Sequence, residues 1–274
     1  MMRLDITESD VCIRHGDRLA GVYHHRHAYK PHLHPLYTPG GHGISLDNPH
    51  DHRHHRGLFY GLKCEDCSFY EEAGDYGVQR HVGFGDDTIA EGETVRFTHL
   101  IEWRRVSDDA AFFSESRRIA CRHDAENRSY RWSWSTRLEA KRAVELVKSP
   151  HSRPDATGTP INYHGLGIRF RRDFSGCPAW YELQANNETA PIEAVHGKPL
   201  GGITWIGRID GTLPIERAAF TLIQHQDFSL FALADPFAFL SFGPTNLEPK
   251  RLETGESLSE SYEAIVGDAP PLGA

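Results

Sequence analysis

Histidines gather in one part of the sequence at a density that suggests chemistry. Seven fall within residues 31–61, PHLHPLYTPGGHGISLDNPHDHRHHRGLFYG, and twelve of the eighteen in the chain lie between His15 and His81. Imidazoles bind metal ions and transfer protons near neutral pH. A solvated loop needs neither property and more often carries Lys, Glu or Ser. The segment therefore predicts a functional site.

The spacing of these histidines leaves three interpretations open. His32 and His34 are two residues apart, so an extended chain would project both from one face. In HDHRHHRGL, His52 and His54 could share one side and Asp51 and His55 the other, unless a turn mixes these sets. Three imidazoles, with or without a carboxylate, suit a divalent ion such as Zn, Mn, Fe or Ni. Without a metal they suit proton transfer. The third interpretation is that several of them have only structural roles.

Residues elsewhere supply further candidates. In NYHGLGIRF, Tyr163 and His164 stand just before an expected strand, where side chains often reach a cleft. Trp205, in GGITWIGR, has glycines nearby and could stack on a sugar ring. Cys64 and Cys67 form a single C-x-x-C, which we interpret as buried thiols because no second pair follows.

Strand patterns dominate the rest of the chain. Residues 129–140, SYRWSWSTRLEA, alternate apolar and polar side chains, which predicts a half-buried strand with Trp132 and Trp134 in the core. Residues 165–172 repeat the pattern, and only residues 66–73 suggest a short helical turn. A dozen or more strands without crossover helices predict an all-β fold, a large antiparallel sandwich of two sheets.

Domain organisation and composition narrow the function classes. We expect one sandwich domain over residues 1–267 and a frayed tail over residues 268–274. The formal net charge of -8 and the absence of a long basic run argue against nucleic-acid binding. No apolar run is long enough for a membrane helix, and no signal-like segment is present, so we expect a cytoplasmic protein without membrane partners. Five cysteines argue against a disulfide framework.

Two segments resemble the signature of the bacterial family labelled methane-oxygenase PmoA-like. KPHLHPLYTPGG and DHRHHRGLFYG are similar to the family patterns P-Y-x-H-P-x-x-T-P-x-G and D-H-x-x-H-R-G-L. A weaker Q-x-H element matches Gln79 and His81, whereas residues 225–248 depart from the pattern. The resemblance implies a soluble sandwich of the galactose-mutarotase-like type and a link to sugar catabolism. It does not imply the membrane enzyme of the family label, because membrane spans are missing.

The resemblance also selects site residues. It implies that His34, His52 and His55 are the catalytic or metal-binding histidines, and that Thr38, Gln79 and His81 lie close to substrate. Arg56 would either bind a sugar oxygen or pair with an acid such as Asp51. His164 and Trp205 complete the expected substrate-binding set. By similarity to the C-terminal part of mutarotase-like sandwiches, Glu248 is the candidate general base.

Three functions follow as hypotheses. The first is a carbohydrate-active lyase or isomerase in which histidines move protons on a sugar or 3-keto sugar, by elimination, hydration or epimerisation. The second is a metal-dependent oxygenase or hydrolase with His34, His52 and His55 as ligands. The third is a non-catalytic sugar-binding module. In each case the expected partner is a small carbohydrate, no nucleotide cofactor is expected, and the oligomeric state is left open.

Overall fold

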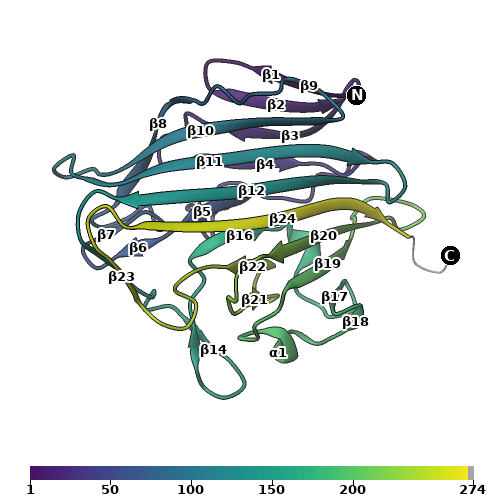
Figure 1. Ribbon diagram of the computed structural model, residues 1–274. Helices are drawn as coiled ribbons and strands as arrows, with labels where there is room; N and C mark the ends of the chain where they lie inside the picture. The colour runs from purple at the N-terminus through teal and green to yellow at the C-terminus, as the bar shows by residue number, and fades with distance from the viewer. Residues whose placement is uncertain (271–274) are drawn as a thin grey trace.

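Two nine-stranded antiparallel sheets pack face to face in the computed structural model, which describes residues 1–270 (Figure 1). The predicted all-β, two-sheet sandwich is confirmed. Sheet I consists, in spatial order, of β21 (Phe231–Leu233), β22 (Phe239–Phe242), β16 (Gly165–Arg169), β5 (Leu58–Gly61), β4 (His32–Leu36), β3 (Arg18–His24), β2 (Asp10–His15), β1 (Met2–Ile6) and β9 (Glu91–Gly92).

Sheet II contains the longest strands. Its order is β18 (Glu188–Thr189), β17 (Tyr181–Ala185), β19 (Gly202–Arg208), β20 (Arg217–Gln224), β24 (Ser257–Ala269), β12 (Ser129–Ala140), β11 (Ala111–Asp124), β10 (Thr94–Arg105) and β8 (Gly77–Phe84). Smaller sheets join β23 (Lys250–Leu252), β13 (Val144–Leu146), β6 (Lys63–Cys64) and β7 (Cys67–Ser68), and β14 (Arg153–Pro154) with β15 (Pro160–Ile161). The helical elements of the described residues are the 3-10 turn η1 (Arg172–Phe174) and α1 (Ile192–Val195).

The alternation of β12 explains how sheet II contributes to the core. Tyr130, Trp132 and Trp134 are buried, while Arg131 and Ser133 point away from the core. The strand pairs along most of its length with β11 and β24, which fixes this register. Successive side chains of a strand point to opposite faces, so the local pattern alone decides which ones are buried. The predicted core position of both tryptophans is confirmed.

A buried polar network joins the two sheets. The Arg117 guanidinium on β11 donates to Glu115 at 2.7 Å and to the hydroxyl of Tyr23 on β3 at 3.2 Å. Trp103 Nε1 also donates to Glu115, at 2.7 Å. Both members of the ion pair are fully buried. The contact fixes the position of one sheet relative to the other, because an unpaired charge in this place would be costly.

Glu260 on β24 makes a second polar contact between the sheets. Tyr60 on β5 donates to one oxygen at 2.9 Å, and Tyr262 donates to the other at 2.6 Å. Burial raises the pKa of Glu260 to about 7, although both hydrogen bonds favour the charged form. This carboxyl therefore titrates in the physiological range while lying inside the sandwich.

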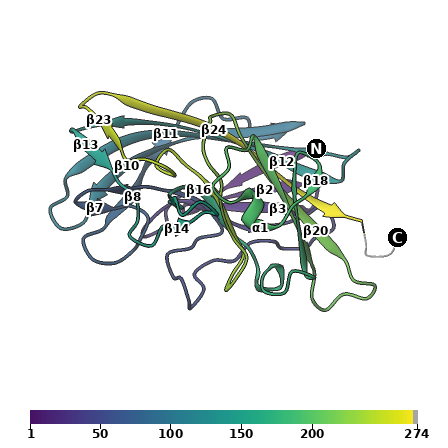
Figure 2. The same cartoon turned by 90° about the horizontal axis from the view of Figure 1, so that it is seen from below.

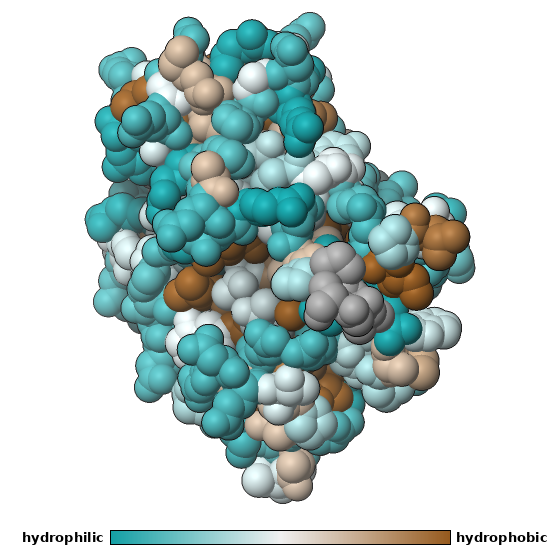
Figure 3. Space-filling view, turned by 90° about the vertical axis from the view of Figure 1, so that its right-hand side faces the viewer, coloured by the Kyte–Doolittle hydropathy of each residue, from teal (hydrophilic) through white to brown (hydrophobic). Residues whose placement is uncertain are grey.

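Long loops cover the face of sheet I that points away from sheet II, and Figure 2 shows them extending on that side. The surface around the C-terminal end of the sandwich is mainly hydrophilic, with a few small apolar areas (Figure 3). No helix within residues 1–270 is long and apolar enough to cross a membrane. The loops on sheet I are where the histidine-rich segment lies.

Two expectations are corrected in detail. β24 continues to Ala269, and Asp268 accepts hydrogen bonds from the backbone of Gly40 and from Arg128, so the sandwich extends beyond the expected boundary at residue 267. Residues 271–274 of the expected tail lie outside the described residues. Residues 66–73 form no helical turn; they contain β7 and bends. Cys64 and Cys67 face each other across the β6–β7 hairpin as buried free thiols, as expected.

Candidate functional site

The outer face of sheet I carries a row of aromatic side chains. The registers place Phe231 opposite Ser241, Ser241 opposite Gly167, Gly167 opposite Phe59, and Phe59 opposite His32. Residues directly opposite in antiparallel strands share a face. The intervening residues of these strands fill the core between the sheets. The residues on the outer face form a second apolar cluster, together with loop residues that pack on that face.

Gly167 makes room for the Phe239 ring in this surface. A Cβ at Gly167 would lie 2.6 Å from Cζ of Phe239 and 3.0 Å from Cβ of Ser241. The Phe239 ring therefore lies over the backbone of β16. Its ring stacks on His55, with centroids 4.9 Å apart. A glycine is required here for close approach rather than for its backbone angles.

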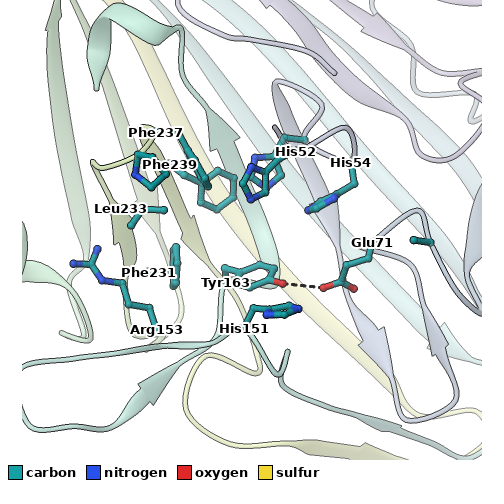
Figure 4. Close-up of a pocket in the computed structure, with 13 residues that line it drawn as sticks. His52, His54, Glu71, His151, Arg153, Tyr163, Phe231, Leu233, Phe237 and Phe239 are labelled. Carbon is teal, nitrogen blue, oxygen red and sulfur yellow. Dashed lines mark hydrogen bonds between the residues drawn. The ribbon is translucent and has the colours of Figure 1, made fainter. Parts of the chain in front are cut away.

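A cavity of about 630 Å³ opens above this surface. Its volume is in the range of sites for small organic molecules. Figure 4 shows Phe231, Leu233, Phe237 and Phe239 on one side and His52, His54 and Glu71 on the other. The residues that line it are His52, His54, His55, Glu71, Ala73, His151, Arg153, Tyr163, Phe231, Leu233, Pro236, Phe237 and Phe239. We call this cavity the pocket.

Arg169, at the end of β16, anchors the histidine loop to the sheet. The side chain is buried and donates to Asp51 at 2.6 Å and to Nδ1 of His55 at 3.2 Å. Its guanidinium also lies 4.0 Å from the ring centroid of Phe237. The arginine thus connects the polar and the aromatic walls of the pocket, through ion pairing on one side and a cation–π contact on the other.

The hydrogen bonds of His52 determine which nitrogen carries its proton. Nδ1 lies 3.1 Å from Oδ2 of Asp51. Although burial opposes ionisation of Asp51, hydrogen bonds from Arg169 and His52 hold the pKa of its carboxyl well below the usual range. An ionised carboxylate only accepts, so Nδ1 must donate. In the neutral ring, Nε2 then keeps its lone pair, and within residues 1–270 it makes no hydrogen bond.

His55 adopts the tautomer opposite to that of His52, because its Nδ1 faces a donor. Arg169 only donates, so Nδ1 of His55 must accept, and the hydrogen of the neutral ring is on Nε2. Burial, with the neighbouring His54 and Arg169, holds the pKa of His55 well below its usual value, so the ring is neutral at pH 7. The rings of His52 and His55 are stacked, with centroids 4.9 Å apart. The pocket wall thus presents a base beside an N–H donor.

A carboxylate lies on the same wall. Oε1 of Glu71 accepts a hydrogen bond from the Tyr163 hydroxyl at 2.9 Å and lies 3.4 Å from Nε2 of His164. Burial raises its pKa, but His164, Ser68 and Tyr163 outweigh this and hold the pKa of Glu71 well below its usual range. Ser149 in turn contacts the Tyr163 hydroxyl at 2.6 Å. Glu71 is therefore a fixed negative charge.

Charged residues behind the wall stabilise it. Arg56 forms a bidentate ion pair with Glu72, with Nε 3.0 Å from Oε1, and a longer contact of 3.6 Å with Asp47. Lys30 lies 3.3 Å from Glu72, and burial lowers the pKa of Lys30 to about 8. Arg56 is therefore structural and does not line the pocket; of its two expected roles, pairing with acids is the one observed, with Glu72 and Asp47 in place of Asp51.

His34, expected to act with His52 and His55, is not brought to them. It stands on β4, its Nδ1 is 2.9 Å from Oγ of Ser45, and it does not line the pocket. Within residues 1–270, no group of three or more His, Cys, Asp or Glu side chains is arranged to hold a metal ion. The predicted ligand set is thus not assembled, because β4 and the histidine loop direct these imidazoles to different partners.

Thr38 and Gln79, both expected to bind substrate, have structural contacts away from the pocket. Oγ1 of Thr38 accepts from the backbone of His42 at 3.3 Å. Gln79 is buried between Arg117 and the Tyr60 carbonyl. Thr38 thus stabilises a loop and Gln79 lies inside the sandwich, so neither side chain lines the pocket.

His81, His164, Trp205 and Glu248 complete the comparison. Nδ1 of His81, on β8 of sheet II, is 2.9 Å from Nε2 of His99 on β10, and Trp205 is a fully buried core residue. Glu248 is exposed and lies outside the pocket. His164 does not line the pocket; its Nε2 lies 3.4 Å from Oε1 of Glu71, which does.

The sequence interpretation missed Glu71, His151, Arg153 and the phenylalanines of β21 and β22. Tyr163 was named as a residue whose side chain could reach a cleft, but it was not among the expected site residues. No local signal marks Glu71, which we placed in an expected helical turn. The phenylalanines did carry a signal: residues 237–242, FAFLSF, are almost continuously apolar, a pattern typical of a strand covered on both faces, and β22 is buried on both.

Comparison with known proteins adds a family. The model of a family of unknown function, DUF6807, matches residues 10–271. No curated protein matches the chain in sequence. Among solved structures, the alpha-galactosidase from Lactobacillus brevis aligns with a TM-score of 0.31 and 8% sequence identity, over 98% of this chain and 39% of that one. The chain thus spans well under half of the galactosidase's length.

Proposed function

The chain belongs to the DUF6807 family, whose function is unknown, and from the pocket we propose that it is a carbohydrate-active enzyme that moves a proton beside a carbonyl group. One observation carries the proposal. Asp51 fixes His52 with a free Nε2, and Arg169 fixes the stacked His55 with its hydrogen on Nε2. A base next to a neutral donor is what proton abstraction beside a carbonyl requires.

The opposite wall supports a sugar as the substrate. Phe231, Phe237 and Phe239 present apolar rings to the pocket. The C–H face of a pyranose packs against such rings, while its hydroxyls need polar partners on the other side. Glu71 and His151 offer acceptors there. The pocket therefore matches a small ring that is apolar on one face and polar at its edge.

The chemical step uses the two imidazoles in different roles. Nε2 of His52 takes the proton from the carbon beside the carbonyl. The electron pair of the broken C–H bond then forms a double bond to the carbonyl carbon. The Nε2–H of His55 donates to the carbonyl oxygen as negative charge develops there. The imidazolium of His52 is stabilised by Asp51, which remains ionised. His55 stays neutral, so it acts through its hydrogen bond and not by proton loss.

The fate of the enolate depends on the substrate. On a 3-keto glycoside, loss of the C2 proton allows the C1 substituent to leave with its bonding pair, forming a C1–C2 double bond. The His52 imidazolium can return its proton to the departing oxygen, which regenerates the base. On a substrate without a leaving group, return of the proton to carbon gives exchange or epimerisation. Both outcomes begin with the same abstraction.

The test is proton exchange in deuterated water. Purified protein is mixed with a methyl 3-keto-glucoside and with aldoses, and NMR follows loss of the C2–H signal and release of methanol. We expect exchange or elimination with the wild type and its loss in His52→Ala. Absence of both with folded wild-type protein would reject the enzyme. Sugar binding without turnover, unchanged in His52→Ala, would instead identify a sugar-binding module.

A further inference from the structure

Arg153 lines the pocket with most of its hydrogen-bonding capacity unused. Within residues 1–270, its side chain makes one hydrogen bond, from Nη1 to the carbonyl oxygen of Ala232 at 3.3 Å, and no ion pair. A guanidinium has five N–H donors in a planar fork. Four of them therefore remain for another partner, on a residue that borders a cavity of about 630 Å³.

The backbone of Arg153 is held in place by a buried histidine. The backbone N–H of Ala232 donates to Nδ1 of His196 at 3.1 Å, so the ring hydrogen of the neutral form is on Nε2. Nε2 lies 3.2 Å from the Arg153 carbonyl oxygen, to which it donates. His196 is only 3% exposed, and burial lowers its pKa. This histidine thus connects β14 to β21, and the arginine position belongs to a fixed part of the fold.

The nearest acid in the sequence does not neutralise this charge. Oδ1 of Asp155 accepts from the backbone N–H groups of Thr157 and Thr159, at 2.8 and 3.0 Å, and from the Thr157 hydroxyl at 2.7 Å. It stabilises its own turn between β14 and β15. Arg153 thus has no carboxylate partner within residues 1–270, and its charge is available to a ligand.

Arg153 and Glu71 lie on different sides of the pocket. Figure 4 shows Arg153 beside Phe231 and Leu233, whereas Glu71 lies beyond Tyr163. Glu71 is a fixed negative charge, so an anionic group is repelled at that end and attracted at the other. The two charges would therefore orient a ligand that carries one anionic group.

Resting on the proposed function, we propose that Arg153 binds the carboxylate of an acidic sugar, so that the substrate class is a uronate or its oxidised derivative. The planar fork matches the two oxygens of a carboxylate in bidentate geometry. The carboxylate then lies at the Phe231 side, and the sugar ring extends along the phenylalanines toward His52. Arg153 acts in binding and orientation and takes no part in proton transfer.

Binding measurements on the full chain test this directly. Calorimetry compares D-glucuronate, D-glucose and D-glucose 6-phosphate. We expect glucuronate to bind at least about tenfold more tightly than glucose. Arg153→Gln should remove that preference, so that glucuronate binds no more tightly than glucose, and Arg153→Lys should keep only part of the preference because the fork is lost. Arg137→Gln, at an exposed position of sheet II, is the matched control and should change nothing.

Three outcomes would overturn the assignment. They are equal affinity for glucuronate and glucose, a preference that survives in Arg153→Gln with an unchanged melting temperature, and glucose 6-phosphate binding as tightly as glucuronate. The measurement needs no turnover, so the two proposals fail separately. Uronate binding through Arg153 without proton exchange would reject only the enzyme, whereas exchange on neutral sugars without a uronate preference would reject only this subsite.

Discussion

Asp51 and His52 are adjacent in sequence, and a carboxylate oxygen of the first lies 3.1 Å from Nδ1 of the second. The same oxygen accepts from Arg169 at 2.6 Å, so the carboxylate is held from the sheet while it orients the imidazole. Neighbouring residues can form this contact only because the loop turns there: the His52 N–H donates to the Pro49 carbonyl at 3.1 Å. Arg169 of β16 thus positions the base His52 indirectly, by holding Asp51, the residue that precedes it.

Replacing His52 by Ala is expected to lower the exchange rate at least about a hundredfold, the usual contribution of a positioned general base. The side chain is partly exposed, so the fold should tolerate the change. NMR exchange rates and circular dichroism check both points. His50→Ala, at an exposed position of the same loop, is the control. An equal loss of rate in both variants would contradict the assignment of His52.

Arg169→Met should destabilise the protein by about 1.5–3 kcal/mol, because it removes charged hydrogen bonds to Asp51 and His55, while Arg172 still contacts Asp51 at 3.2 Å. It also frees Nδ1 of His55, so that both tautomers of that ring become accessible. Urea unfolding gives the stability, and the exchange rate at a temperature where the variant is folded gives the second effect. Unchanged stability would mean that the arginine does not anchor the loop.

Glu260 should make stability depend on pH in the direction opposite to a salt-bridged carboxylate. Burial raises its folded-state pKa from 4.5 to about 7, so the folded state binds more protons than the unfolded state between these values. Its contribution is fully present below about pH 4.5 and is lost as the pH rises through about 7, a change of about 3 kcal/mol. Urea unfolding of wild type and Glu260→Gln from pH 4 to 8 measures this. A constant difference would contradict it.

Gly167→Ala is expected to cost about 1–3 kcal/mol and to weaken sugar binding, because the new methyl group would displace the Phe239 ring. Calorimetric binding and thermal unfolding report the two effects. Gly83→Ala is a suitable control, since a Cβ there meets nothing within 4 Å. Full binding by Gly167→Ala would show that the Phe239 ring is not part of the sugar platform.

Metal removal provides a further test. Because His34 contacts Ser45 and not the pocket, His34→Gln and dialysis against a chelator should each leave the exchange rate within about a factor of two. The rate of chelated protein, with and without added Zn²⁺ or Mn²⁺, is the measurement. A large loss that only the metal restores would favour the metal-dependent hypothesis, with ligands other than His34.

The strands could be predicted because their signal is local. The alternation around Trp132 and Trp134 follows directly from the geometry of a strand, and enough such segments without helices leave only a sandwich or barrel. The histidine loop could also be found, since its density is unusual on its own. Three of its histidines, His52, His54 and His55, line the pocket. The shared motif selects His52 and His55 and passes over His54.

The rest of the site depends on contacts between distant parts of the chain. Glu71 meets Tyr163 and His164 over more than ninety positions, and the role of Arg169 depends on how β16 pairs with β5 and β22. The sequence contains no local mark of such pairing. The prediction that His34 acts with His52 and His55 was wrong for the same reason. Its place in the motif is visible in the sequence, but the direction of its side chain follows from the bulged pairing of β3 with β4.

Because alternate residues of β5, β16 and β22 face opposite ways, one set fills the sandwich and the other forms the floor of the pocket. Substitutions on the outer set leave the tightly packed interior untouched. The loops and the outward side chains can therefore change without repacking the interior. The same separation makes the chain a practical framework for engineering new specificities.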